Sequence, residues 1–275
     1  LPVESAVARV RAAGARPWLT IVNDVASGHG IALKDPQVVH DLLSGEERRA
    51  AHRAAIMDLA SRYGMSGVDI DYENLRARDR ALFTTFVREL AADARRQGVL
   101  LSVTVQPKLG DRWSDGSGAM DWGPLCATAD RLQIMLYNLH SRATGPGPMA
   151  TGRWIRGVLN YANSQCDPKR VVPVLKVSGM RWADGTVEGI QYDQAIALAQ
   201  EHGASISRDA DDQVPYFTYR VNEQPHTVYY EDAVSLTEKL EVIRSLGYRT
   251  VLLWSLGRQD PALLPPFAAE ESRGR

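Results

Sequence analysis

The chain has 275 residues, of which 44% are hydrophobic and 24% charged, so it is long enough to bury the core of one large α/β domain. Its formal net charge of -1, from 32 basic and 33 acidic residues, gives no electrostatic argument for nucleic acid or an anionic membrane as partner. No stretch approaches the roughly 18 apolar residues of a membrane span. The start, Leu1 to Glu4, lacks the features of a signal peptide and predicts a mature or trimmed product.

Short apolar, β-branched runs alternate with longer helical patterns along the chain. Because several of these runs are almost continuously hydrophobic, they predict parallel strands that are buried on both faces. The predicted strands cover residues 18–22, 67–72, 100–105, 132–137, 171–177 and 250–254. The predicted helices cover residues 3–13, 46–63, 82–94, 193–202 and 233–246. This repeating order of strand and helix predicts a parallel α/β architecture.

The number of predicted strands leaves two architectures open. A closed TIM (β/α)8 barrel needs eight strands and the pattern provides six, so two N-terminal strands would lie upstream of Leu1. An open, doubly wound sheet explains six strands equally well. Residues 178–232 contain a helical pattern and then a segment rich in Tyr, Val and turn residues. We expect a small antiparallel insertion there, within a single domain that spans residues 1–275.

The run from Ser66 to Glu73 contains three acids at alternating positions: Asp69, Asp71 and Glu73. On a strand they share one face at spacings of about 6.6–6.8 Å, while the intervening residues occupy the other face. Burying several negative charges together is unfavourable, so the pKa values of the three carboxyls must separate. Glu73 comes last, at the C-terminal rim where barrel active sites are built. A carboxyl with a raised pKa at this rim could act as a general acid.

Two other interpretations of this acidic strand remain open. An amphipathic strand with its acids in water explains an isolated D-x-D-x-E pattern about as well. Three carboxylates could also hold a divalent cation. No histidine partner stands near these strands in the sequence, which disfavours the metal site. The two cysteines, Cys126 and Cys166, fit neither a metal-ligand spacing nor a disulfide framework, and could pair only if the fold brought them together.

Three segments, in the right order, resemble the motifs of glycoside hydrolase family 18. The acidic strand is similar to the family's D-G-x-D-x-D-x-E, with Ser66 in place of the leading Asp. The segment Met135-Leu136-Tyr137-Asn138 is similar to the family's M-x-Y-D on strand six. The segment that ends at Trp254 is similar to the family's strand eight, whose Trp forms the floor of the sugar site. Further segments, among them Gly145–Ala150, resemble the bacterial spore-cortex and cell-wall N-acetylglucosaminidases of this family.

The resemblance implies a retaining, substrate-assisted glycosidase that needs no cofactor. Glu73 would protonate the glycosidic oxygen, and the substrate's own acetamido oxygen would attack the anomeric carbon. Asp71 would hold the acetamido N–H, and Asp69 would share a proton or hydrogen bond with Asp71. Tyr137 would donate its hydroxyl to the acetamido oxygen, while Trp254 would lie beneath the sugar ring. Glu73 would finally act as a base on the water that hydrolyses the intermediate.

Two departures from the family pattern affect this expectation. Ser66 replaces an Asp that lies far from the chemistry, and a serine can still form a hydrogen bond. Asn138 replaces an acid that helps to orient the acetamido group, so its charge is lost. Further residues that follow or end the predicted strands, or lie in the insertion, are candidates for substrate binding. These candidates are Gln106, Trp182, Asn23 and Glu231.

We therefore expect a monomeric hydrolase of β-linked N-acetylglucosamine glycans, peptidoglycan or chitin-like, without metal or nucleic-acid partners. The resemblance implies a secreted protein, or one associated with the cell wall or the spore. A non-catalytic barrel that binds cell-wall glycans is the alternative, but such members of the family usually lack the catalytic acid that Glu73 provides. Whether cleavage is endo or exo is not encoded in these motifs.

Overall fold

The computed structural model describes residues 2–27 and 30–263. It divides into two compact units, each with its own internal contacts. The first unit consists of Leu1–Ile134 and Tyr161–Val172, and the second of Met135–Asn160 and Pro173–Arg275. The divisions fall inside two strands and a helix, so that β6 (Arg131–Met135), β7 (Val171–Lys176) and α6 (Gly152–Gln165) contribute residues to both units.

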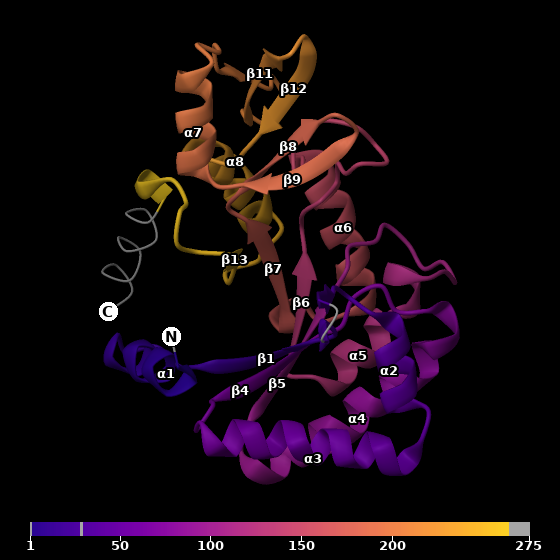
Figure 1. Cartoon of the computed structure of the whole chain (residues 1–275). Helices are drawn as coiled ribbons and strands as arrows, with labels where there is room; N and C mark the ends of the chain where they lie inside the picture. The colour runs from indigo at the N-terminus through magenta and orange to yellow at the C-terminus, as the bar shows by residue number, and fades with distance from the viewer. Residues whose placement is uncertain (1, 28–29, 264–275) are drawn as a thin grey trace. The chain divides into compact units, whose positions relative to one another are not determined.

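The first unit contains parallel strands in the order β1, β4, β5, β6, each paired to the next in the register of a parallel sheet. The strands are β1 (Trp18–Val22), β4 (Gly67–Asp71), β5 (Leu100–Val105) and β6 (Arg131–Met135). A hairpin of β2 (Val25–Ser27) and β3 (Gly30–Ala32) follows β1. The helices are α1 (Val3–Ala12), α2 (Pro36–Leu43), α3 (Glu46–Arg62), α4 (Arg80–Gln97) and α5 (Trp122–Thr128). In Figure 1, α3 and α4 run beside each other next to these strands.

The helix-facing side of β4 is fully apolar or aromatic. Val68, Ile70 and Tyr72 are buried, and the ring of Tyr72 stacks near His52 of α3 and Phe86 of α4. Burial of such side chains stabilises the fold by about 1.5–3 kcal/mol for each one that is fully covered. The alternation along β4 therefore sends Asp69 and Asp71 to the opposite face, as the sequence predicted.

A packing contact that the sequence alone did not reveal explains why a glycine stands at position 67, at the start of β4. Trp18 is its direct register partner on β1, and a Cβ at Gly67 would lie 2.5 Å from the indole ring of Trp18. Only a residue without a side chain leaves room for this ring. The glycine of the motif thus fixes the pairing of β1 with β4.

Cys126 and Cys166 form a disulfide, with their Cα atoms 5.7 Å apart. Both residues belong to the first unit, Cys126 in α5 and Cys166 just after α6. The bond ties together segments that are 40 residues apart in sequence. Disulfides persist mainly in oxidising compartments.

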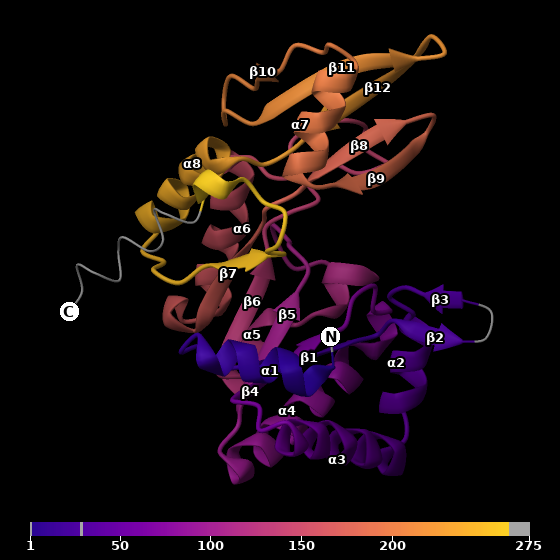
Figure 2. The same cartoon turned by 60° about the vertical axis from the view of Figure 1, so that its left-hand side comes forward.

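The second unit contains a parallel pair and an antiparallel sheet. Strand β13 (Leu252–Trp254) runs parallel to β7, and the amide of Leu136, just after β6, also donates to the carbonyl of Val174 on β7. Between β7 and β13 the chain forms an antiparallel sheet in the order β10, β11, β12, β8, β9 (Figure 2). These strands are β8 (Gly179–Ala183), β9 (Thr186–Ile190), β10 (Ser207–Arg208), β11 (Pro215–Val221) and β12 (Gln224–Tyr229).

Two helices complete the second unit, α7 (Tyr192–Glu201) and α8 (Ala233–Ser245). Helix α7 packs Ala195 and Ala199 against Phe217, Tyr219 and Val228 of the antiparallel sheet. Helix α8 begins with a capping box in which Asp232 accepts from the amide of Ser235. The short 3-10 turns of the chain are η1 (Ala77–Asp79), η2 (Gly116–Ala119), η3 (Pro168–Arg170) and η4 (Pro261–Leu263).

The predicted strands correspond to β1, β4, β5, β6, β7 and β13, with ends that differ by up to two residues. The prediction that β4 extends to Tyr72 was too long by one residue, because the strand ends at Asp71. Three helices were missed: α2, α5 and α6. Two of them are short, and α5 contains Gly123 and Pro124, which disfavour a helical prediction.

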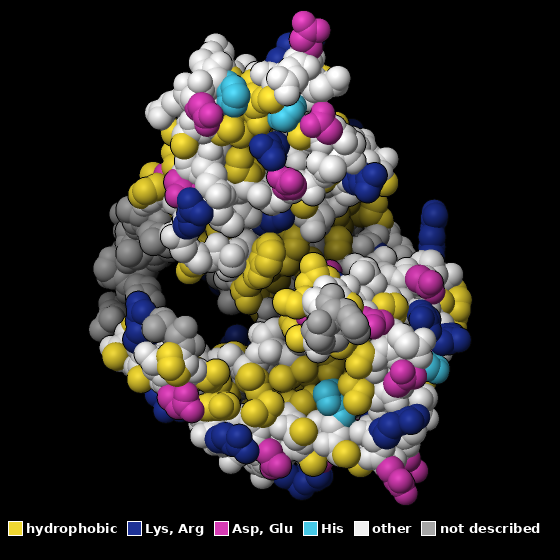
Figure 3. Space-filling model, in the orientation of Figure 1, with side chains coloured by type: hydrophobic (Ala, Val, Ile, Leu, Met, Phe, Trp, Pro, Cys, Tyr) yellow, Lys and Arg dark blue, Asp and Glu magenta, His cyan; other side chains and the backbone are white. Residues whose placement is uncertain are grey.

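The surface agrees with the balanced charge of the sequence. On the face drawn in Figure 3, acidic and basic side chains are interspersed and form no large patch of one sign. No helix within residues 2–27 and 30–263 is both long and apolar enough to span a bilayer.

Candidate active site

The polar side of β4 is lined by hydrogen-bond donors from the neighbouring strands. Asp69 is buried and accepts hydrogen bonds from Ser102 Oγ at 2.6 Å and Thr104 Oγ1 at 2.9 Å, both on β5. Gln133 Nε2 of β6 approaches the same carboxyl at 3.3 Å. Burial raises the pKa of Asp69, although the bonds from Ser102 and Thr104 act in the opposite direction. The hydrogen bonds of Asp69 among the described residues thus run to β5 and β6, and not to Asp71 as expected.

Asp71, at the end of β4, lies in a different environment. Burial raises its pKa to about 7, the negative charge of Glu73 adds to this rise, and the charge of Lys34 opposes it. Its Oδ1 atom is buried and has no hydrogen-bond partner among the described residues. A buried acceptor without a donor is unfavourable, and such atoms often lie where a ligand binds. Asp71 therefore presents an oxygen that is available to an N–H or O–H donor.

Glu73 lies two residues beyond the end of β4 and is held through its backbone. The amide of Glu73 donates to Asn23 Oδ1 at 2.9 Å, and Asn23 Nδ2 donates to the carbonyl of Glu73 at 2.9 Å. Asn23 is only 3% exposed and also bonds to the carbonyl of Asp35. The side chain of Asn23, which the sequence suggested as a substrate ligand, is thus used to fix the main chain at Glu73.

The side chain of Glu73 forms an ion pair with Lys34, a residue that the sequence reasoning missed. Lys34 Nζ lies 3.1 Å from Glu73 Oε1 and 3.7 Å from Asp24 Oδ1. Its own amide donates to Asp24 Oδ1, and its backbone adopts a left-handed conformation with φ 55°. Burial lowers the pKa of Lys34, but its hydrogen bond with Glu73 and the surrounding acids outweigh this effect, so the pKa is raised. Lys34 lies 39 positions before Glu73, and no motif pointed to it.

Gln106 follows β5, and its amide donates to the sulfur of Met120 at 3.3 Å. Its side-chain Oε1 is buried without a hydrogen-bond partner among the described residues. Like Asp71, Gln106 therefore offers a buried acceptor in the first unit. The loop after β5 is attached to the segment after Glu73, because Gly116 N donates to Leu75 O at 2.7 Å.

The second unit contributes an aromatic pair. Tyr137, just after β6, stacks on Trp254 with ring centroids 5.7 Å apart and an interplanar angle of 13°. Tyr137 is buried, whereas Trp254 is 48% exposed. An exposed indole that is held by stacking provides a flat apolar surface of the kind on which sugar rings bind.

Lys176 and Asn138 lie at this aromatic pair. Lys176, the register partner of Trp254 on β7, has its Nζ 5.5 Å from the centre of the Trp254 ring and 3.5 Å from Asn138 Oδ1. Burial lowers the pKa of Lys176 to about 8, and the charge of Glu231 partly opposes this effect. Asn138 is exposed and has a left-handed backbone with φ 63°, which Asn and Asp tolerate better than most residues. No sequence motif distinguishes Lys176 within a run that is otherwise apolar.

The side chains of two other predicted binding residues form hydrogen bonds within the second unit. Trp182 is buried in a cluster with Met135, Tyr137 and Val174, and its Nε1 donates to the carbonyl of Ser141 at 3.3 Å. Glu231 is 1% exposed and accepts from Lys239 Nζ at 2.6 Å and from Ser235 Oγ at 2.7 Å. These contacts hold Glu231 against the first turn of α8.

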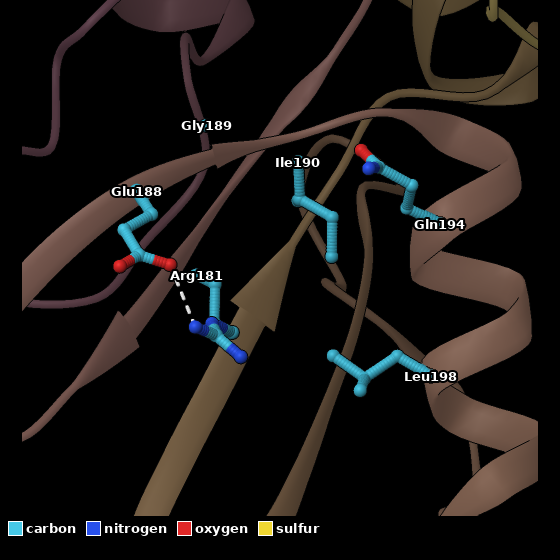
Figure 4. A pocket seen from close by; sticks show the side chains of 6 residues that line it. All are labelled: Arg181, Glu188, Gly189, Ile190, Gln194 and Leu198. Atoms are coloured by element: carbon cyan, nitrogen blue, oxygen red, sulfur yellow. Dashed lines mark hydrogen bonds and ion pairs between the residues drawn. The ribbon is translucent and has the colours of Figure 1, made fainter.

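A separate pocket in the second unit contains none of the predicted site residues. Figure 4 shows its lining on β8, β9 and α7, where Arg181 donates to Glu188 at 2.6 Å. Within the described part of the chain, no group of three or more His, Cys, Asp or Glu side chains is arranged to hold a metal ion.

Comparison with known proteins gives a consistent result. The profile of the family described as "Glycosyl hydrolases family 18" matches residues 35–260. The Bacillus subtilis protein YdhD, named as a sporulation-specific glycosylase, is 30% identical over 248 residues, which cover 87% of this chain and 57% of that protein. The cortical fragment-lytic enzyme of Bacillus subtilis is 29% identical over 231 residues, covering 80% of this chain and 53% of the enzyme. The chain thus spans somewhat more than half the length of these relatives.

Solved structures show the same likeness. The crystal structure of YdhD from Bacillus subtilis superposes with a TM-score of 0.83 at 27% identity, covering 94% of this chain and 86% of that structure. A chitinase from Chromobacterium violaceum has a TM-score of 0.85 at 23% identity, covering 99% of this chain and 84% of that one, and so shares the fold.

Proposed function

Because the chain belongs to glycoside hydrolase family 18, we propose that it cleaves β-linked N-acetylglucosamine glycans by a retaining, substrate-assisted reaction with Glu73 as general acid and base. The single observation that carries the proposal is the arrangement around β4. Glu73 is fixed by Asn23 through two backbone hydrogen bonds, and the neighbouring Asp71 has a buried oxygen without a donor. This combination provides a positioned acid and a free acceptor.

The first step divides the work among these groups. Glu73 gives its proton to the glycosidic oxygen, and the C–O bond to the leaving sugar breaks. The acetamido oxygen of the substrate forms the new bond to the anomeric carbon, so the positive charge moves onto the acetamide. Asp71 Oδ1 accepts the acetamido N–H, which supplies the donor that this oxygen lacks. We assign the Tyr137 hydroxyl to the acetamido oxygen and the exposed ring of Trp254 to the sugar face.

The second step reverses the role of Glu73. Its carboxylate removes a proton from water, and this water attacks the anomeric carbon. The attack opens the five-membered oxazolinium ring that the acetamido oxygen formed in the first step, and it restores the original anomeric configuration. Asp69 acts through the strand: its bonds to Ser102 and Thr104 hold the polar side of β4 in place. No step needs a metal or an organic cofactor.

We propose peptidoglycan as the substrate class, and a location at the cell wall or the spore. The support is the similarity to YdhD and to the cortical fragment-lytic enzyme, together with the disulfide between Cys126 and Cys166. Chitin is the competing substrate, in view of the shared fold with a chitinase.

The test compares the wild-type chain with Glu73→Gln on N-acetylglucosamine oligomers and on peptidoglycan fragments, with mass analysis of the products. Glutamine keeps the shape of the side chain but cannot donate an acidic proton. We expect turnover to fall by at least about a thousandfold while calorimetry shows that glycan binding persists. Undiminished turnover by Glu73→Gln would overturn the assignment. Binding without any product from the wild-type chain would favour a non-catalytic glycan-binding protein.

A further inference from the structure

Lys176 is a buried cation with no acidic partner at hydrogen-bonding distance. It is 8% exposed, and within residues 2–27 and 30–263 no carboxylate lies within 4.0 Å of its Nζ. Removing an ammonium from water without a counter-charge is unfavourable, so proteins rarely leave a buried lysine unpaired.

The other buried lysines of the described chain follow the usual pattern. Lys239 is 1% exposed and lies 2.6 Å from Glu231 Oε2. Lys108 lies 3.0 Å from Asp111 Oδ1 and also donates to the carbonyl of Met120. Both have a structural role that their partners explain. Among the described residues, Lys176 has a weak contact with Asn138 Oδ1 at 3.5 Å and lies near the face of Trp254, while the charge of Glu231 reaches it from beyond ion-pair distance.

The position of Lys176 connects it to the sugar-binding surface of the second unit. Its register partner is Trp254, and the ammonium lies over the indole ring that is 48% exposed. The cation therefore lies close to the indole ring on which a sugar ring would stack. A pKa of about 8 leaves Lys176 mostly protonated at neutral pH.

We propose that Lys176 binds an anionic substituent of the glycan, a carboxylate carried by the sugar on Trp254 or by its neighbour. The inference rests on the proposed function and narrows its substrate class. A neutral chitin chain offers no such group, whereas a wall glycan carries carboxylates on its peptides and on those lactyl ethers that are not condensed with a peptide. A charge-assisted hydrogen bond from a desolvated ammonium to a carboxylate is one of the stronger polar contacts in proteins. Lys176 thus favours acidic glycans over neutral ones.

The experiment compares two soluble substrates that differ in charge: carboxymethyl-chitin, which carries carboxylates, and glycol chitin, which is neutral. The variants are Lys176→Met, which keeps the apolar stem, and Lys169→Met, an exposed lysine far from the aromatic pair in sequence that gives the same change in net charge. We expect Lys176→Met to lower kcat/KM about tenfold on carboxymethyl-chitin and less than twofold on glycol chitin. Lys169→Met should change neither, and thermal unfolding checks that both variants fold.

Binding gives a second readout that does not depend on turnover. In the Glu73→Gln background, Lys176→Met should weaken the binding of carboxymethylated oligomers about tenfold and leave that of neutral oligomers unchanged. The preference should also decrease as salt is raised. Equal losses on both substrates, or no loss on either, would overturn the proposal. If the wild-type chain cleaves neither substrate, the proposed function fails. Calorimetric measurement of the binding of carboxymethylated and neutral oligomers then still decides the role of Lys176.

Discussion

The polar groups of the first unit and those of the second are buried in different ways. On β4, Asp69 is bonded by neighbouring strands, while Asp71 two residues later keeps a buried oxygen without a donor. In the second unit, Lys239 is paired with Glu231, while Lys176 has no carboxylate within 4.0 Å among the described residues and is reached only by the more distant charge of Glu231. In each unit, a charged group that has its partners thus contrasts with one that lacks them.

This difference separates structural from functional groups better than residue type does. A buried charge that has its partners holds the fold in place, and removing it exposes those partners. A buried polar atom without a partner reduces stability, and a ligand that supplies the partner compensates for it. By this criterion we propose that Asp71 and Lys176 face the substrate, while Asp69 and Glu231 support the fold. The predictions below test this distinction.

The largest effect is expected for Asp71→Asn. The change replaces a carboxylate by a neutral amide, so the negative charge that stabilises the positively charged acetamide in the transition state is lost, and kcat should fall by about 10²–10³-fold. Steady-state kinetics on an N-acetylglucosamine oligomer measures this effect. A variant with kcat within threefold of the wild type would show that Asp71 is not a functional group.

Asp71→Asn should also change stability, with a definite dependence on pH. The pKa of Asp71 is raised to about 7 in the folded chain, whereas an unfolded aspartate titrates near about 4. The carboxyl therefore destabilises the fold increasingly from about pH 4 to about pH 7, and fully above that range. Asparagine does not ionise, so Tm of the variant should match the wild type at pH 4 and exceed it by a few degrees at pH 8. A lower Tm at both pH values would contradict this.

Lys34→Met should have an intermediate effect on turnover. The ammonium lies 3.1 Å from Glu73 Oε1 and anchors the side chain of the proposed acid. Methionine keeps the apolar stem but removes this ion pair, so the carboxyl is held less well and kcat/KM should fall by about three- to tenfold. Steady-state kinetics on the same oligomer measures the change, and thermal unfolding checks that the variant folds. A kcat/KM equal to that of the wild type would show that the ion pair does not influence catalysis.

The smallest effect on activity is expected from replacing both Cys126 and Cys166 by alanine. The disulfide closes a loop between segments 40 residues apart, so its loss should lower the free energy of unfolding by about 2–4 kcal/mol. Thermal unfolding with and without reductant measures this change, and kcat at 25 °C should stay within twofold. If reduction of the wild-type chain leaves Tm unchanged, the bond does not contribute to stability.

Much of the fold was predictable because its signals are local. Continuous apolar runs marked the parallel strands, and alternation along residues 67–72 correctly placed the acids opposite Val68, Ile70 and Tyr72. The helices α2 and α5 were missed because they are short. Helix α6 was missed although Ile155, Val158, Leu159 and Ala162 recur at helical spacing and are buried. The packing of Trp18 against Gly67 could not be foreseen, since it depends on the register between two strands.

The candidate site was predictable only where a motif carried it. The acids of β4, Tyr137 and Trp254 lie in recognisable segments. Lys34 and Lys176 do not, because their importance depends on their neighbours in space. Lys34 has a carboxylate at 3.1 Å, whereas Lys176 has none within 4.0 Å among the described residues and lies near the ring of Trp254. For the same reason, the clamp of Asn23 on the backbone of Glu73 is visible only in the structure.

The central claim is that Glu73 works with the acetamide of the substrate and not with a second carboxylate as nucleophile. Proton NMR of the first product, from an N-acetylated oligomer and from its fully deacetylated counterpart, tests this most directly. We predict that the N-acetylated oligomer releases a product whose new reducing end is initially the β-anomer, while the deacetylated oligomer stays intact. An initial α-anomer, or cleavage of both oligomers at similar rates, would contradict the account.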